Sequence, residues 1–258
     1  MSTISRKLVH KKITINKEVN WDKIGQQKIT ETEEELVSAS LIPEKIVVRP
    51  YYFIQGIEGA KPECYVRSQV LDKLVQAAEM LPRGYKLVIF DAWRPFKVQQ
   101  NLYKMIVNKL KKEHSGFSED KIRSEAENYV APPSGDRECP SPHMTGGAVD
   151  LSIVDESGKL LNMGTAFDTA KKESHTDYYE KKLNENKNQL GSSEMESMQN
   201  RRLLFNIMTS VGFTNYPKEW WHYDYGNQNW AYFNREDVEA FYGKTSPDFI
   251  WEDGPPVN

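Results

Sequence analysis

The sequence Ser141-Pro-His-Met-Thr-Gly-Gly-Ala-Val-Asp150 places a histidine and an aspartate on either side of a Gly-Gly pair, and an alternating segment follows. Glycines at this point give the backbone freedom to turn or to approach another group closely. Beyond them, apolar side chains recur at every second position, which indicates a strand with one apolar face. These side chains are Val149, Leu151 and Ile153. We expect Asp150 on the opposite, less apolar face, where it would point towards a cleft.

Segments typical of strands and of helices surround this one in mixed order. Short β-branched or apolar runs at 44–54 and 86–90 favour strands, and Pro50 edges the first of them. Apolar residues at helical spacing, together with capping residues, predict helices at 66–81, 96–112, 118–129, 199–211 and 235–242. We therefore predict an α+β fold, a single domain with a small central antiparallel sheet flanked by helices.

Composition changes along the chain divide it into regions. Residues 1–43 are polar and charged, which predicts an extended N-terminal arm that includes one short helix, and Trp21 should pack back onto the domain. Residues 44–245 would form that domain. Within it, residues 170–198 are rich in lysine and glutamate and lack apolar periodicity, which predicts a surface excursion or a lid. Residues 246–258 are expected to be a loose tail.

The bulk composition argues against several classes of protein. A formal net charge of -3 over 258 residues is too near neutral to favour nucleic acid or a membrane surface as partner. No stretch approaches the ~20 apolar residues that span a bilayer, and no apolar run follows the N-terminus as in a secretory signal, so we expect a cytoplasmic protein. Cys64 and Cys139 fit reduced thiols better than a disulfide framework. The sequence carries no signal for an oligomeric state.

Two histidines and two carboxylates form a possible metal site. His143 and Asp150 come from the stretch quoted above, and Glu219 and His222 lie about seventy residues later, in Glu219-Trp-Trp-His222. Two imidazoles and a carboxylate can hold a catalytic zinc ion with one open position, and a spare carboxylate can act as general base. Cys139 is a conceivable fourth ligand, but a fourth protein ligand would close that position. Taken alone, these residues leave a zinc hydrolase open against a globular domain of unreadable function.

The spacing of Glu219 and His222 constrains this hypothesis. The two residues would share one face of a helix, but on a regular strand they would point in opposite directions. The aromatic pair between them favours a strand. A bulge or a bend beside Glu219 is therefore needed if both side chains serve one site.

Arg94 lies where the predicted strand at 86–90 gives way to the predicted helix at 96–112, in the segment Asp91-Ala-Trp-Arg-Pro95. That position, at the edge of a sheet, is one where functional sites often lie. A structural ion pair with Asp91 or with surface acids is the commoner role for such an arginine. The sequence leaves both roles open.

The order of the motifs resembles one group of enzymes. The pattern Ser-x-His-x-x-Gly-x-Ala-x-Asp at 141–150, followed by Glu-x-x-His at 219–222, is similar to that of the zinc D-alanyl-D-alanine dipeptidases of the VanX type. The wider group includes D,D-carboxypeptidases and cell-wall endopeptidases. Further matches are Asp-Ala-Trp-Arg-Pro at 91–95, Met-Gly-Thr-x-Phe-Asp at 163–168, Ser-His at 174–175 and Gln-Asn-Arg-Arg at 199–202. The resemblance covers roughly residues 45–232 in consistent order, which a chance match to one motif would not produce.

The resemblance implies a role for each matching residue. Zinc, one ion per chain, would be bound by His143, Asp150 and His222. Glu219 would be the general base and Arg94 would stabilise the oxyanion of the tetrahedral intermediate. The substrate-binding residues would be Asp168, Ser141 and Tyr52.

Asp168 matches the acid that pairs with the free ammonium group of the substrate in this family. An uncharged amide at that place would leave the carboxylate unpaired, which explains a preference for a dipeptide over a longer chain. The amino-terminal pocket departs from the family. Its Tyr-Ala-Thr…Asn-Phe segment is replaced by Arg49-Pro-Tyr-Tyr-Phe53, in which either Tyr51 or Tyr52 takes the place of the pocket tyrosine.

The expected function is hydrolysis of D-Ala-D-Ala or a closely related small cell-wall dipeptide, by zinc-activated water with a glutamate general base in a cleft on the sheet. One alternative is a D,D-carboxypeptidase or peptidoglycan endopeptidase of the same group, which would need export and an open cleft. Another is a non-catalytic wall-peptide binding module, which would need no general base, so Glu219 argues against it. The expected partner is a small dipeptide, with neither nucleic acid nor membrane.

Overall fold

The fold is built on a mixed five-stranded sheet. In the computed structural model, which describes residues 3–127, 130, 132–185, 189–234 and 236–247, the strand order is β2-β4-β5-β7-β6. The strands are Ile46–Val48 (β2), Lys86–Asp91 (β4), Ala148–Val154 (β5), Thr214–Asn215 (β6) and His222–Asp224 (β7). A separate two-stranded sheet pairs β1 (Leu36–Ser38) with β3 (Tyr65–Arg67). The α+β fold is confirmed, except that β2 runs parallel to β4, so that only the other neighbouring strands are antiparallel.

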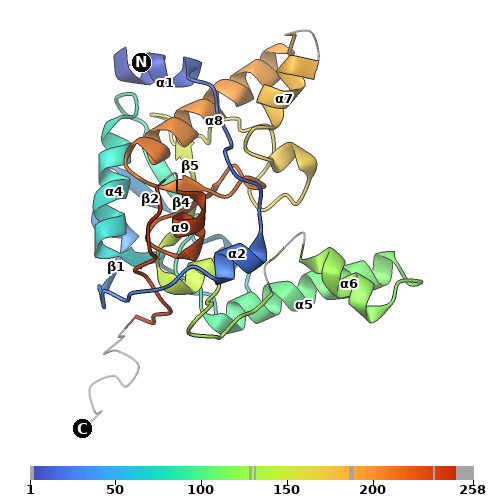
Figure 1. The fold of residues 1–258 in the computed structure, drawn as a ribbon. Helices are drawn as coiled ribbons and strands as arrows, with labels where there is room; N and C mark the ends of the chain where they lie inside the picture. Colours follow the sequence, from blue (N-terminus) through green and yellow to red (C-terminus); the bar gives the residue numbers. More distant parts are fainter. Residues whose placement is uncertain (1–2, 128–129, 131, 186–188, 235, 248–258) are drawn as a thin grey trace.

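Helices surround this sheet. They are α1 (Thr3–His10), α2 (Trp21–Gly25), α3 (Tyr51–Ile54), α4 (Ser68–Glu79), α5 (Phe96–Glu113), α6 (Glu119–Ala126), α7 (Tyr178–Glu185), α8 (Ser192–Ser210) and α9 (Gln228–Phe233). Figure 1 shows α1 lying along α8, while α5 and α6 project together to one side of the molecule. None of the helices in the described ranges combines the length and the apolar character that crossing a bilayer requires.

The two faces of the sheet differ in chemistry. On one face, Val149, Leu151 and Ile153 of β5 join the main hydrophobic core, which includes buried side chains of α4 and α8. The other face carries apolar side chains such as Phe90 and Val154 at one end. Towards its other end, this second face carries the polar side chains of Asp91, Asp150 and His222, which belong to the site described below.

The segment 44–54 is a strand in its first part only. β2 ends at Val48, and α3 follows Pro50, whose φ is −62°. Proline has a fixed φ and no N–H to satisfy, so it suits the start of a helix. The β-branched and aromatic composition hid this short helix, which buries Tyr52.

Residues 3–43 pack on the rest of the chain and are not an extended arm. They form α1, α2 and β1, and they bury Val9, Ile13 and Ile24. Trp21 does pack back as expected, with its ring centroid 5.8 Å from that of Tyr216. A domain boundary at residue 44 stays a prediction.

The polar segment 170–198 contains helices that its lack of apolar periodicity did not predict. α7 lies inside it, and α8 begins at Ser192 rather than at residue 199. Buried charge replaces apolar contact here, because Arg202 donates two hydrogen bonds to Glu180, at 2.6 and 2.7 Å. Arg201 likewise donates to backbone carbonyls. Periodicity cannot reveal such pairs, and the role of the segment as a lid stays a prediction.

The helix predicted at 235–242 is wrong. The last helix of the described residues, α9, begins earlier, after Asn227, whose side chain caps it by accepting a hydrogen bond from the N–H of Trp230 at 2.9 Å. Residues 236–242 are not helical, and Ala240 forms a bridge with Ile29. Residue 235, the end of the helix predicted at 118–129 and most of the tail, 248–258, lie outside the described residues.

The ion pair between Glu180 and Arg202 gives a test of this packing. Glu180→Ala leaves the buried guanidinium of Arg202 without its carboxylate, so we expect the free energy of unfolding to fall by about 3–5 kcal/mol. Glu58→Ala breaks an exposed pair with Lys97 and should cost no more than about 1 kcal/mol. Urea unfolding followed by tryptophan fluorescence measures both, and equal losses would contradict a structural role for the buried pair.

Candidate metal centre and active site

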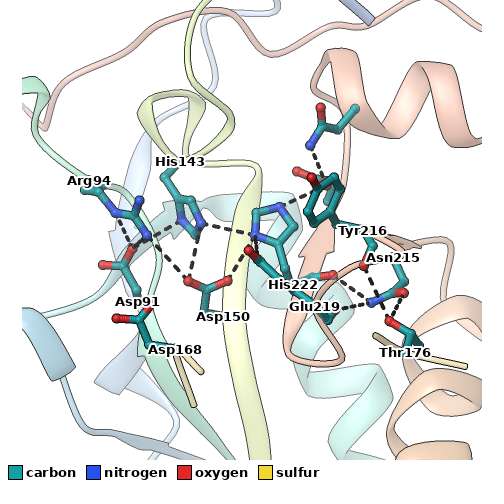
Figure 2. A network of polar contacts seen from close by, with 12 residues as sticks. Asp91, Arg94, His143, Asp150, Asp168, Thr176, Asn215, Tyr216, Glu219 and His222 are labelled. Atoms are coloured by element: carbon teal, nitrogen blue, oxygen red, sulfur yellow. Dashed lines mark hydrogen bonds and ion pairs between the residues drawn. The ribbon is translucent and has the colours of Figure 1, made fainter. Parts of the chain in front are cut away.

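Three neighbouring strands bring ionisable side chains into one row. Asp91 of β4, Asp150 of β5 and His222 of β7 are cross-strand partners. A register shift between Ile89 and Asp91 interrupts β4. Such an irregularity re-aims side chains, and Asp91 lies on the same face as Asp150, with Arg94 in contact with both (Figure 2).

His143 reaches this row from a short 3-10 turn, Pro142–Thr145, just before β5. The turn ends at Gly146, which has a φ of +71°, and a Cβ there would collide with the side chain of Leu36. Only glycine meets both conditions without strain. The chain can therefore reverse sharply between His143 and the strand that carries Asp150.

The two imidazoles and Asp150 converge on one point. His143 Nε2 lies 3.2 Å from His222 Nδ1 and 3.4 Å from Asp150 Oδ2, and His222 Nδ1 lies 3.0 Å from Asp150 Oδ1 (Figure 2). The three side chains are buried, and their ligand atoms all lie within 4.8 Å of one another. They form a group that could hold a metal ion.

Each imidazole has an outer nitrogen, which points away from the cluster, and the partner of that nitrogen decides which ring atom faces the other ligand groups. His143 Nδ1 lies 2.8 Å from the carbonyl oxygen of Ala92, and His222 Nε2 lies 3.1 Å from Asp224 Oδ2. Both oxygens only accept hydrogen bonds, so the outer nitrogens donate to them and the inner nitrogens present lone pairs. Two lone pairs and a carboxylate in such proximity require a cation. The donor set therefore fits a divalent metal ion with oriented imidazole ligands.

A proton on His222 can also supply the positive charge that these groups require. Burial disfavours a charged imidazole, but the carboxylates of Asp224 and Asp150 outweigh it and raise the pKa of His222 well above its ordinary value. A metal ion binding at this point must displace that proton, because a ligating imidazole is neutral.

Asp224 is a site residue that the sequence reasoning missed. It is fully buried, and its carboxylate accepts hydrogen bonds from Asn227 Nδ2 at 2.7 Å and Asn229 Nδ2 at 3.1 Å. Residues two apart on a strand share a face. Since His222 was expected on a strand, this two-residue period predicts that Asp224 faces the same side, and that signal in the sequence could have identified it.

Glu219 and His222 converge because only one of them is on a strand. β7 begins at His222, and Glu219 lies in the preceding turn, where its N–H donates to the carbonyl of Tyr216 at 3.1 Å. Glu219 Oε2 is 3.8 Å from His222 Nδ1. Burial, opposed by His222 and reinforced by Asp150, raises the pKa of Glu219 to about 7. A turn thus provides the bend that the spacing of the two residues demanded.

Arg94 forms the ion pair with Asp91 and also lines the cleft, while its functional role stays a prediction. Its Nε and Nη2 donate to Asp91 Oδ2 at 2.8 and 2.7 Å, and its Nη1 donates to Gln99 at 2.6 Å. Nη2 is also 3.5 Å from Asp150, and the guanidinium lies over the ring of Tyr52. These contacts do not engage every N–H group of the guanidinium, so a rigidly held arginine can still donate into the cleft.

Asp168, Tyr52 and Ser141 line the same cleft. The hydroxyl of Tyr52 donates to Asp168 Oδ1 at 3.3 Å, whereas Tyr51 packs against Phe167. Asp168 has a φ of +61°, a backbone conformation that is uncommon for any residue but glycine. Burial in the cleft, opposed by Arg94 and reinforced by the charge of Asp150, raises the pKa of Asp168.

The cleft that joins these residues has a volume of about 180 Å³. Apolar side chains of α5 form one wall, and Trp21 and Tyr216 contribute to another. A larger cavity, of about 410 Å³, lies between residues 11–17 and the end of α8, but its lining includes none of the residues above. The convergence of ionisable groups, and not the size of the cavity, identifies the smaller cleft as the candidate site.

A comparison with known proteins agrees with this chemistry. A family model described as D-ala-D-ala dipeptidase, peptidase M15, matches residues 49–242, most of the chain. The chain belongs to this peptidase family. The resemblance found in the sequence is thereby confirmed, and so is the expectation of an enzyme.

Individual relatives are similar over most of their length. A D-alanyl-D-alanine dipeptidase of Synechocystis is 29% identical over 222 residues, which are 74% of this chain and 89% of the relative. One of Escherichia coli is 26% identical over 201 residues, 76% of this chain and 86% of the relative. A solved structure described as VanYB in complex with D-alanine-D-alanine matches with 20% identity and a TM-score of 0.36, covering 65% of this chain and 75% of the other.

The metal centre makes a binding prediction. We expect the metal-free protein to bind about one Zn²⁺ per chain and to release protons as it does so. His222→Ala should weaken binding by more than the roughly 100-fold known for loss of an outer partner, whereas His175→Ala should not. Calorimetric titration in buffers of different ionisation enthalpy measures affinity and proton release together. Equal affinities of the two variants would exclude this site.

Proposed function

We propose that this peptidase hydrolyses D-Ala-D-Ala, or a closely related small cell-wall dipeptide, with a zinc ion held by His143, Asp150 and His222. The names of its relatives support the substrate class. The observation that carries the proposal is the position of the Glu219 carboxylate beside three convergent ligand groups. A carboxylate whose pKa lies near neutrality, in a cleft, is what a proton-transferring group requires.

A bound zinc ion would act as a Lewis acid that polarises the scissile carbonyl and lowers the pKa of a water molecule. The set of two imidazoles and one carboxylate suits it, because it leaves a coordination position open. The contacts of His143 with Ala92 and of His222 with Asp224 hold both rings in the orientation that this requires.

Glu219 moves the proton. It would accept a proton from the attacking water as the new C–O bond forms, and deliver it to the amine of the C-terminal residue as the C–N bond breaks. Burial raises the pKa of this carboxyl above its ordinary value, which suits a group that must both accept and release a proton near neutral pH. A binding module would not need this group.

Arg94 would stabilise the oxyanion that develops on the scissile carbonyl. Asp91 and Gln99 hold its guanidinium in place before the reaction, so little reorganisation is needed when the charge appears. The charge is partly shared with Asp91 and Asp150. Arg94 is thus a donor whose direction is fixed.

Asp168 would mark the amino end of the substrate. Its carboxylate can pair with a free ammonium group, and the hydroxyl of Tyr52 orients it. Ser141 is buried beside His143 and lines the same cleft, so it offers a neutral hydrogen-bonding group to the dipeptide. This arrangement favours a free dipeptide over an acylated peptide.

Release of D-alanine from D-Ala-D-Ala tests the proposal directly. We expect turnover that a chelator abolishes and Zn²⁺ restores, with little activity on L-Ala-L-Ala. Glu219→Gln should lower kcat by roughly 10²–10⁴-fold because proton transfer is lost, while Zn²⁺ stays bound. Full activity of this variant, or of the chelated protein, would refute the proposed mechanism.

The pH dependence of kcat/KM follows from the ionisation of Glu219. The base must be deprotonated, so the rate should rise with pH through its pKa. Burial raises this pKa from 4.5 to about 7, and a neighbouring metal ion would lower it again. We therefore expect the midpoint of the acid limb between these values, and its absence in Glu219→Gln. A midpoint clearly above pH 7 would argue against Glu219 as the base.

Asp168→Asn tests the amino-end pocket, because asparagine tolerates a positive φ and has the same shape. Loss of an ionic hydrogen bond worth about 1.5–3 kcal/mol should lower kcat/KM for D-Ala-D-Ala roughly 10- to 150-fold. N-acetyl-D-Ala-D-Ala, which has no ammonium group, serves as the control and should be affected far less. If wild-type protein prefers the acetylated peptide, a D,D-carboxypeptidase becomes the better description.

A further inference from the structure

The turn that carries Glu219 is held by a buried amide. Asn215 of β6 donates from Nδ2 to the backbone carbonyl of Glu219 at 3.0 Å and to that of His222 at 2.9 Å (Figure 2). Both acceptors are carbonyls, so the amide must present its NH₂ group to them, and its Oδ1 faces the other way. One side chain therefore ties the backbone of the proposed base to the backbone of a proposed ligand.

Thr176 fixes this amide from the far side. Its hydroxyl donates to Asn215 Oδ1 at 2.7 Å, and the residue is almost fully buried (Figure 2). The hydroxyl hydrogen bond selects the amide orientation in which NH₂ meets the two carbonyls. The pair thus forms a chain of hydrogen bonds from residue 176 to the turn.

The backbone around Thr176 supports the same turn at two further places. The N–H of Thr176 donates to the carbonyl of Pro217 at 3.0 Å, and the N–H of Trp220 donates to the carbonyl of Ser174 at 3.0 Å. These bonds lie on either side of Glu219 in the sequence. The segment at 174–176, from the region expected to be a lid, therefore braces the turn.

From these contacts we infer that Asn215 and Thr176 are positioning residues, which hold Glu219 and His222 in the mutual orientation that the reaction needs. This inference rests on the proposed function. Neither residue contacts the three ligand groups directly, so both act through the backbone of the turn. A shift of that backbone moves the carboxylate of Glu219 and the imidazole of His222 together, and a misplacement near 1 Å can cost about 10²-fold in rate.

Substrate binding should be largely spared. The hydroxyl of Thr176 contacts Asn215 Oδ1 and, at 3.4 Å, the carbonyl of Tyr216, whereas Asp168 and Tyr52 contact each other. A positioning role therefore predicts a loss in kcat and in metal affinity with little change in KM. A purely structural role predicts a lower melting temperature with kcat per folded molecule unchanged.

Three threonine variants separate these roles. Thr176→Val keeps the shape of the side chain and removes the hydroxyl, so we expect kcat on D-Ala-D-Ala and the Zn²⁺ affinity of the metal-free protein to fall roughly 10- to 100-fold. Thr176→Ser restores the hydroxyl and should restore both. Thr209→Val is the matched control, because its hydroxyl donates at 2.7 Å to the carbonyl of Phe205 in its own helix, away from the turn. That variant should keep wild-type kcat and Zn²⁺ affinity.

Asn215→Ala removes both donated bonds and should show the larger effect; if it does not fold, the threonine series still decides. Wild-type kcat and Zn²⁺ affinity in Thr176→Val, with only a lower melting temperature, would overturn the inference. If the wild-type protein binds Zn²⁺ but does not cleave D-Ala-D-Ala, the proposed function fails. In that case the Zn²⁺ affinities alone test the positioning of His222: a loss in Thr176→Val supports it, and wild-type affinity overturns it.

Discussion

Two imidazole nitrogens and a carboxylate face one another at 3.0 to 3.4 Å on one face of the sheet. Their lone pairs repel, and burial makes that repulsion stronger than it would be in water. The protein does not relieve it by turning the rings away, because Ala92 and Asp224 hold the outer nitrogens. The fold thus maintains an arrangement that is favourable only with a cation in the middle, and much of the surrounding structure serves to keep it.

That constraint explains several local features that otherwise look unrelated. The irregularity in β4 turns Asp91 towards His143 and Arg94, and Gly146 lets the chain reverse before β5. The turn before β7 places Glu219 next to His222 instead of opposite to it. Each feature breaks regular secondary structure at one end of the central strands, where side chains from different segments meet. Together they gather acidic side chains in one cleft, which suits a metal ion.

Much of this could be predicted from the sequence where apolar periodicity carries the information. The alternation in β5 indicated the strand and the face of Asp150, and helical spacing indicated α4 and α5. Prediction from apolar periodicity failed where buried polar contacts stabilise the chain, as at α7 and the start of α8. It also failed at α9, where a capping side chain starts the helix. Motif order brought out the residues proposed as ligands. Asp224 and Asn215, which contact the ring and the backbone of His222, have no motif of their own.

The convergence of His143, Asp150 and His222 on one metal ion is the claim on which the rest depends. Anomalous diffraction at the zinc absorption edge, from crystals grown with Zn²⁺ alone, tests it most directly. We predict one strong peak about 2 Å from His143 Nε2, His222 Nδ1 and an Asp150 oxygen, with a position left open towards Glu219. A peak elsewhere with this cluster empty, or a fourth protein ligand closing the site, would contradict it.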